Sequence, residues 1–152
     1  MSLNPEFLTT DQLRDRVEKV YIEHIKLCQD NFLYFVQNVW PDFICRKEKD
    51  PTKWGHHQHI AHELTNISKG TGGRLIVNMP PRHTKSEFAS YLFPAWYIGK
   101  YPKKKIMQVS HNAELSARFG SKVRNLIDSQ EYKSIFGDVR LREDSKAKGR
   151  WE

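Results

Sequence analysis

The chain has few cysteines and no run of about 18 consecutive apolar residues, the minimum length for a membrane-spanning helix. Charged residues, Asp11, Arg14 and Asp15, occupy the segment in which a signal peptide would need a continuous apolar stretch. Cys28 and Cys45 lie far apart and do not form a Cys-x-x-Cys pair. These absences predict a cytoplasmic protein in which both thiols are reduced.

Acidic residues are scarce in the C-terminal third. The net charge is +7, and residues 100–152 contain 13 Lys and Arg against 7 Asp and Glu. The basic residues gather before and on a predicted helix: Lys100, Lys103, Lys104, Lys105, Arg118, Lys122 and Arg124. Such a field attracts nucleic acid phosphates without reading base sequence. The alternative is a solvated surface that keeps the protein soluble.

The first 40 residues have a helical pattern. Thr9-x-x-Gln12 is a capping box, and apolar residues recur at helical spacing as far as Trp40, before Pro41. We predict one long helix or two shorter ones, with residues 1–50 forming an α-helical lead-in and linker and residues 51–152 a second unit. The apolar stripe is expected to pack against the rest of the protein, and a subunit-docking surface is the alternative.

The most informative segment is Arg74–Ser86, where an apolar run leads into a loop that ends in Lys85-Ser86. A phosphate-binding P-loop places its lysine and its Mg²⁺-binding hydroxyl in this way. The usual pattern has glycine six residues and one residue before the lysine, whereas this chain has Met79 and Thr84. Glycine is favoured there because it tolerates positive φ. The alternative is a strand, a Pro-Pro turn and an ordinary basic helix start.

Two strand candidates and two helix candidates alternate after residue 74. A helix is expected from Ser86, kinked or split by Pro94, then a strand over 105–110, then a helix capped by Asn112. This order predicts an α/β fold, a P-loop NTPase-like parallel sheet flanked by helices.

Four runs together resemble the ATPase domain of the large terminase subunits, the motors that push DNA into the capsids of tailed bacteriophages. The runs are residues 75–87, 93–99, 109–111 and 119–124. Many phosphate loops of that family have Pro-Pro-Arg before a Gly-Lys-Ser ending, so Thr84 departs even from the family's looser pattern. The resemblance covers about residues 50 to 152.

The resemblance implies a function, cofactors and partners. The chain would be the ATP-binding part of a viral DNA-packaging motor that couples ATP hydrolysis to translocation of double-stranded DNA, with Mg²⁺ as cofactor. The small terminase subunit, the portal and a homo-oligomeric ring are the implied partners, in the cytoplasm of the bacterial host. No run of four or more apolar residues after Ile127 ends in a carboxylate. The acidic Mg²⁺-binding strand and the nuclease domain are therefore expected to be absent, leaving the front part of a motor domain.

Site roles follow from the loop chemistry and from the resemblance. Lys85 is expected to bind the β/γ phosphates, Ser86 to ligate Mg²⁺, and Pro81, Arg82, His83 and Thr84 to form the wall of the loop. Arg82 would also stabilise the transferred phosphoryl charge, and its alternative role is to tether the loop to a carboxylate. His83 is expected to face solvent.

A histidine-rich segment precedes the first strand candidate. In a helix, His59, His62 and Glu63 would share one face at metal-ligand spacing, although the second histidine of the metalloprotease pattern is replaced by Asn66. The resemblance instead implies an adenine-recognising segment, in which Gln58 would bind the base edge and Trp54 would stack on the ring. Both residues could equally cap and pack the helix.

Two other functions are compatible with the sequence. A helicase-like nucleic-acid ATPase of another family would share the loop and the basic surface. A non-enzymatic DNA-binding or assembly module would bind DNA in a salt-dependent way that is indifferent to Lys85 and to Mg-ATP.

Overall fold

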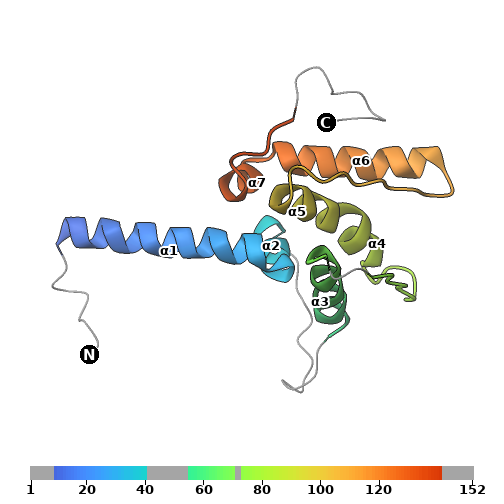
Figure 1. Cartoon of the computed structure of the whole chain (residues 1–152), viewed down its shortest axis with the longest axis horizontal. Helices are drawn as coiled ribbons and strands as arrows, with labels where there is room; N and C mark the ends of the chain where they lie inside the picture. The colour runs from blue at the N-terminus through green and yellow to red at the C-terminus, as the bar shows by residue number, and fades with distance from the viewer. Residues whose placement is uncertain (1–8, 41–54, 71–72, 142–152) are drawn as a thin grey trace.

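The computed structural model describes residues 9–40, 55–70 and 73–141, and within these ranges the regular structure is helical (Figure 1). The elements are α1 (Thr10–Asp30), α2 (Phe32–Val39), α3 (His56–Ser68), α4 (Lys85–Glu87), the π-helical segment η2 (Phe88–Leu92), α5 (Phe93–Lys100), α6 (Ala113–Asp128) and α7 (Gln130–Ile135).

The predicted N-terminal helix is confirmed as two helices. The Thr9 hydroxyl accepts a hydrogen bond from the Gln12 amide, and the Gln12 side chain accepts one from the Thr9 amide, so the capping box is formed. The Asn31 side chain accepts from the Tyr34 amide and starts α2. Only the last turns of α1 reach the other helices, because every side chain from Thr10 to Glu23 is exposed (Figure 1).

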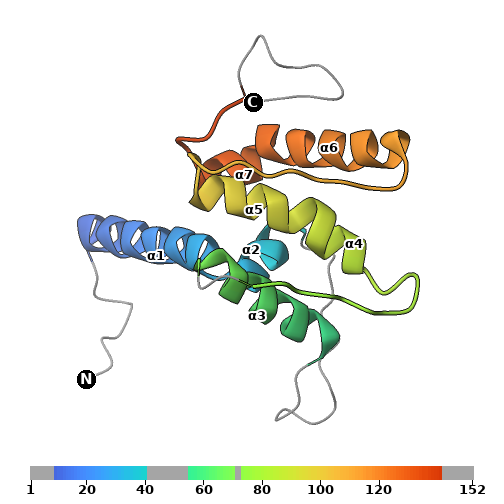
Figure 2. The ribbon, with the colours of Figure 1, turned by 45° about the vertical axis from the view of Figure 1, so that its right-hand side comes forward.

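The predicted parallel sheet is wrong, because the described residues contain no strand. Both strand candidates, residues 74–79 and 105–110, run without ladder partners, and Ile76 and Met107 expose 92% and 88% of their surface. The helix that starts at Lys85 lies between the two segments, so they do not meet (Figures 1 and 2). An alternation of apolar runs and helices gives a sheet only where the runs become neighbours.

The helix after the loop continues through Pro94, where the sequence predicted a kink or a split. α4, η2 and α5 follow one another without interruption from Lys85 to Lys100, and Pro94 lies in the first turn of α5. Proline has no N–H to donate to the carbonyl four residues earlier, which belongs to Ser90. Gln108 Nε2 donates to that carbonyl oxygen over 3.1 Å. The side chain from the second strand candidate therefore satisfies the group that proline leaves open, and the π-helical segment absorbs the change in register.

One hydrophobic core joins the N-terminal helices to the rest. Its largest fully buried side chains come from six elements: Cys28, Phe32, Phe35 and Val36 in α1 and α2, Phe88, Leu92 and Trp96 in η2 and α5, and Val123, Ile127 and Tyr132 in α6 and α7. Two buried hydrogen bonds cross it: Trp96 Nε1 donates to the Cys28 carbonyl over 3.0 Å, and the Tyr132 hydroxyl donates to the Ala95 carbonyl over 2.8 Å.

Of the two cysteines, Cys28 lies among the described residues. Cys28 is a free thiol, and burial raises the pKa of that thiol, so it is protonated at neutral pH. Cys45 lies outside the described residues, as does the predicted boundary at residue 50. Within the described ranges, no helix combines the length and the apolar character needed to cross a bilayer.

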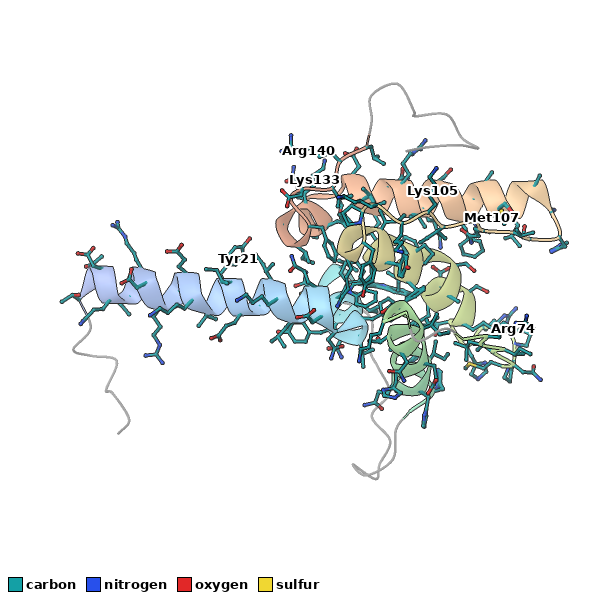
Figure 3. The ribbon with its side chains drawn as sticks, in the orientation of Figure 1. Tyr21, Arg74, Lys105, Met107, Lys133 and Arg140 are labelled. Atoms are coloured by element: carbon teal, nitrogen blue, oxygen red, sulfur yellow. The ribbon has the colours of Figure 1, made fainter. Side chains whose placement is uncertain are left out.

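Side chains outside the core are distributed unevenly. Tyr21 on α1 and Met107 on the second extended segment extend from the ribbon into solvent (Figure 3). The other exposed large apolar side chains lie on the same two regions and on the first extended segment: Leu13, Val17, Val20, Ile22, Leu27, Leu75, Ile76, Ile106 and Val109.

Candidate phosphate site

The loop before α4 surrounds an open hollow of about 490 Å³. Its lining consists of Pro80, Pro81, Arg82, His83, Thr84, Lys85, Ser86 and Glu87. The structure thus brings together the six contiguous residues, Pro81 to Ser86, that the sequence predicts for a phosphate loop.

The backbone of the loop is left-handed at Thr84, one of the two positions where the P-loop pattern has glycine, and at Arg82, whereas Met79, at the other glycine position, does not have positive φ. Arg82 and Thr84 have φ of 65° and 59°, and they are the non-glycine residues with positive φ in the described chain. His83 between them therefore has negative φ. Turn conformations with left-handed residues direct successive N–H groups into a concavity that favours an anion. A non-glycine residue adopts left-handed backbone at a cost of about 1–2 kcal/mol.

Lys85 stands at the first position of α4 and its side chain folds back over the loop. Its ammonium nitrogen donates to the Met79 carbonyl oxygen over 3.2 Å. An ammonium has three N–H donors, and this bond uses one of them. The lysine is therefore held across the hollow with donors to offer an anion.

The helix that begins at Lys85 points its N-terminal end at the loop (Figures 1 and 2). The N–H groups of a helix's first turn carry partial positive charge and favour an anion. Ser86 follows in that first turn and lines the hollow. Glu87 is the one carboxylate among the eight lining residues, and Lys122 of α6 holds both its oxygens at 2.8 and 2.9 Å. This ion pair fixes the start of the helix against α6.

The sequence reasoning missed His57. Its Nε2 lies 2.6 Å from the Thr84 hydroxyl oxygen, and its ring stacks on Phe88 at 5.1 Å with an interplanar angle of 21°. The side chain is 7% exposed. The position of His57 on the buried face of α3, three and seven residues before Ile60 and Leu64, was the available signal.

The environment of His57 favours the neutral imidazole. Burial, with smaller contributions from the charges of His56 and His83, lowers the pKa of His57 to about 4. The rings of His56 and His57 are 3.9 Å apart, and those of His56 and His83 are 6.0 Å apart. His83 is exposed, as the sequence predicts, and its Nδ1 lies 2.9 Å from the Pro81 carbonyl oxygen.

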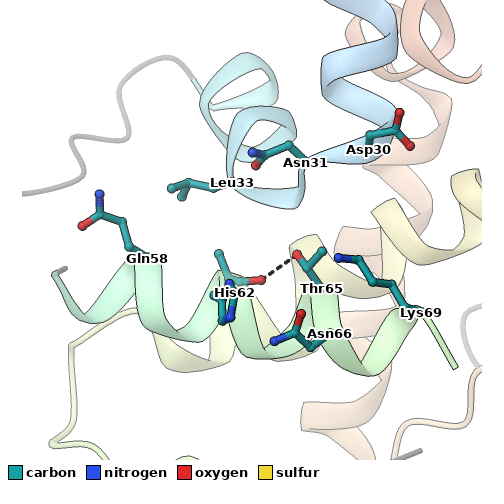
Figure 4. Close-up of a pocket in the computed structure, with 9 residues that line it drawn as sticks. Asp30, Asn31, Leu33, Gln58, His62, Thr65, Asn66 and Lys69 are labelled. Atoms are coloured by element: carbon teal, nitrogen blue, oxygen red, sulfur yellow. Dashed lines mark hydrogen bonds between the residues drawn. The ribbon is translucent and has the colours of Figure 1, made fainter. Parts of the chain in front are cut away.

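Gln58 faces a different hollow. Its Oε1 accepts from the Gly55 amide over 2.7 Å, which caps α3. Gln58 also lies at one end of an open cleft, which is lined by it and by Asp30, Asn31, Leu33, Ala61, His62, Thr65, Asn66 and Lys69 (Figure 4). This cleft shares no lining residue with the phosphate loop. Trp54, the predicted ring-stacking partner, lies outside the described residues.

The metal-ligand spacing on α3 is not completed by a ligand from another described element. His59, His62 and Glu63 all lie on α3, and the described part of the chain contains no group of three or more His, Cys, Asp or Glu side chains that could hold a metal ion.

The cations predicted to attract nucleic acid are partly neutralised. Lys100 Nζ lies 2.9 Å from an Asp30 carboxylate oxygen, and Lys122 is paired with Glu87. Lys103, Lys104 and Lys105 are exposed at the start of the second extended segment. Of the seven predicted cations, the exposed ones are therefore these three lysines and Arg118 on α6.

Comparison with protein-family models, with curated proteins and with solved structures finds no match for this chain. Any functional proposal therefore depends on the geometry of the loop and on the motifs in the sequence.

Proposed function

We propose that the loop Pro80–Ser86 binds the phosphates of ATP together with Mg²⁺. The observation that carries the proposal is the loop itself: left-handed residues at positions 82 and 84, with Lys85 held across the hollow at the head of a helix. Lys85 supplies the cation for the β/γ oxygens, Ser86 supplies the hydroxyl for Mg²⁺, and Arg82 is an auxiliary cation.

The motifs around the loop suggest the larger context. We infer that the chain is the ATP-binding part of a DNA-packaging motor of the terminase large subunit type, which acts in the host cytoplasm. In the complete motor it would work with double-stranded DNA, a small terminase subunit, a portal and further copies in a ring. Glu87 is already neutralised by Lys122, so no lining carboxylate is left to orient a water molecule. The chain alone is therefore expected to bind ATP and to hydrolyse it poorly.

Calorimetric titration with Mg²⁺ and a non-hydrolysable ATP analogue tests the phosphate site. Lys85→Ala should weaken binding about 10- to 100-fold, because a hydrogen bond to a charged group contributes about 1.5–3 kcal/mol. Lys104→Ala is the matched control, since it removes the same charge from an exposed position outside the loop. Equal loss in both variants, or no binding by the folded wild type, contradicts the proposal.

DNA binding separates the motor from a simple DNA-binding module. Fluorescence anisotropy of a labelled duplex should show affinity that changes when Mg²⁺ and the analogue are added, and Lys85→Ala should abolish that change. Salt-dependent DNA binding that changes neither with Mg²⁺ and the analogue nor with Lys85→Ala would identify the non-enzymatic alternative.

A further inference from the structure

Thr84 has a backbone conformation that is unusual for its residue type. It stands where the P-loop pattern has glycine, and its φ of 59° and ψ of 7° are left-handed. A β-branched residue adopts this conformation rarely. The surrounding structure must therefore hold Thr84 in place.

The Thr84 hydroxyl joins two parts of the molecule. It donates to the carbonyl oxygen of the preceding His83 over 2.6 Å, and it lies 2.6 Å from His57 Nε2. A hydroxyl has one hydrogen to donate. Both short contacts of the hydroxyl are hydrogen bonds at once only in the tautomer in which His57 Nε2 carries the proton and donates to the Thr84 oxygen.

His57 is itself fixed. Its ring lies on the face of Phe88, which is fully buried in the core, and its backbone belongs to α3. The imidazole is therefore a rigid donor that extends from the core to the loop, and the loop hydroxyl is anchored to it.

We propose that His57 is a positioning residue of the phosphate loop: its Nε2–H, bonded to the Thr84 hydroxyl, keeps Thr84 in the left-handed conformation for which glycine is usually chosen. The inference rests on the proposed phosphate site. It accounts for the departure from the glycine pattern, because threonine contributes a hydroxyl that glycine lacks and that His57 can hold.

A double-mutant cycle between the two residues tests the link. His57→Phe keeps the stacking ring and removes the donor. It should weaken Mg²⁺-dependent binding of the analogue about 3- to 10-fold, the loss that corresponds to one hydrogen bond. In the Thr84→Gly background the same change should alter affinity by less than about twofold, because glycine adopts the left-handed backbone without help.

A conservative variant provides the rescue. His57→Gln places an amide N–H near the position of Nε2 and should retain most of the wild-type affinity. Equal weakening by His57→Phe in the wild-type and Thr84→Gly backgrounds would mean that the histidine acts only through packing, and the proposal would be overturned.

A measurement without ligand keeps this inference separate from the proposed function. The ¹³Cα and ¹³Cβ shifts of Thr84 report its backbone conformation, and the ¹⁵N shifts of His57 report which ring nitrogen carries the proton. His57→Phe should move the Thr84 shifts away from left-handed values while far-UV circular dichroism stays helical. Unchanged Thr84 shifts would refute the positioning role even if the wild type binds nucleotide. Failure of the wild type to bind, with the expected shifts, would refute only the phosphate site.

Discussion

His57 couples the stability of the protein to pH, because the folded chain buries it in the neutral form. Its pKa is about 4 in the folded protein and 6.5 in the unfolded chain, so the unfolded state binds more protons between these values. The stabilisation is complete above pH 6.5 and is lost as the pH falls toward 4. His56 and His83, whose rings lie nearby, add repulsion when they are protonated.

Urea denaturation between pH 7.5 and 4.5 measures this effect. The wild type should lose on the order of 2 kcal/mol more than His57→Phe over that range, because each pKa unit corresponds to about 1.4 kcal/mol. The variant lacks the titrating ring and keeps the carboxylates, so the difference isolates His57. Parallel stability curves for the two proteins would show that His57 has an ordinary pKa.

The residues that form the loop could be predicted from the sequence, whereas the contact between the loop and His57 could not. Lys85 and Ser86 follow from their order after an apolar run. His57 contacts Thr84 across 27 positions of the chain, and no local pattern encodes such a contact. Gln58 differs, because its cap to Gly55 is a local contact that the sequence offered as the alternative to base recognition.

The two halves of α1 differ in how far their side chains are buried against the rest of the protein. Thr10 to Glu23 are exposed, whereas the last turn is anchored by the buried Cys28. An isolated helix shorter than about 12–15 residues is marginal in water even with good caps. The first half therefore depends on its capping box and on continuity with the anchored turn.

Hydrogen exchange should divide α1 accordingly. Amides from Leu13 to Glu23 should exchange much faster than those around Cys28, when both are followed by mass spectrometry on overlapping peptides. Thr9→Ala should raise exchange in the first half only, because it removes the capping oxygen. Uniformly slow exchange along all of α1 would show that its exposed half is covered in solution.

Helices were predictable to a degree that strands were not. The caps at Thr9 and Asn112 are local features, and the structure confirms them. A strand depends on a partner that local sequence does not name. Residues 74–79 and 105–110 have apolar runs typical of buried strands, yet the intervening helix separates them.

At the scale of the whole molecule, α5 and α7 approach closely at Gly99. A Cβ built on Gly99 would lie 2.6 Å from the Phe136 ring and 2.7 Å from the Tyr132 hydroxyl oxygen. Both rings belong to the single core that also contains the N-terminal helices. Damage at this contact should therefore lower the stability of the whole unit and not of one end.

Gly99→Ala should destabilise the protein by about 1–3 kcal/mol, the usual cost of overpacking a core. Thermal unfolding followed by tryptophan fluorescence measures the change, because the buried Trp96 belongs to the same core. Gly137→Ala is the matched control, since its added Cβ would meet the Lys133 carbonyl oxygen at an ordinary 3.5 Å. Similar melting temperatures for wild type and Gly99→Ala would mean that the rings move aside freely.

The two extended segments without ladder partners also affect how copies of the chain behave toward one another. Each exposes apolar side chains along such a backbone, which is the usual template for association between chains. Each also carries basic residues at its start, Arg74 in one and Lys103 to Lys105 in the other. We expect mutual repulsion between these charges to keep the segments of different copies apart. Because salt screens that repulsion, the solubility of the protein should fall as ionic strength rises.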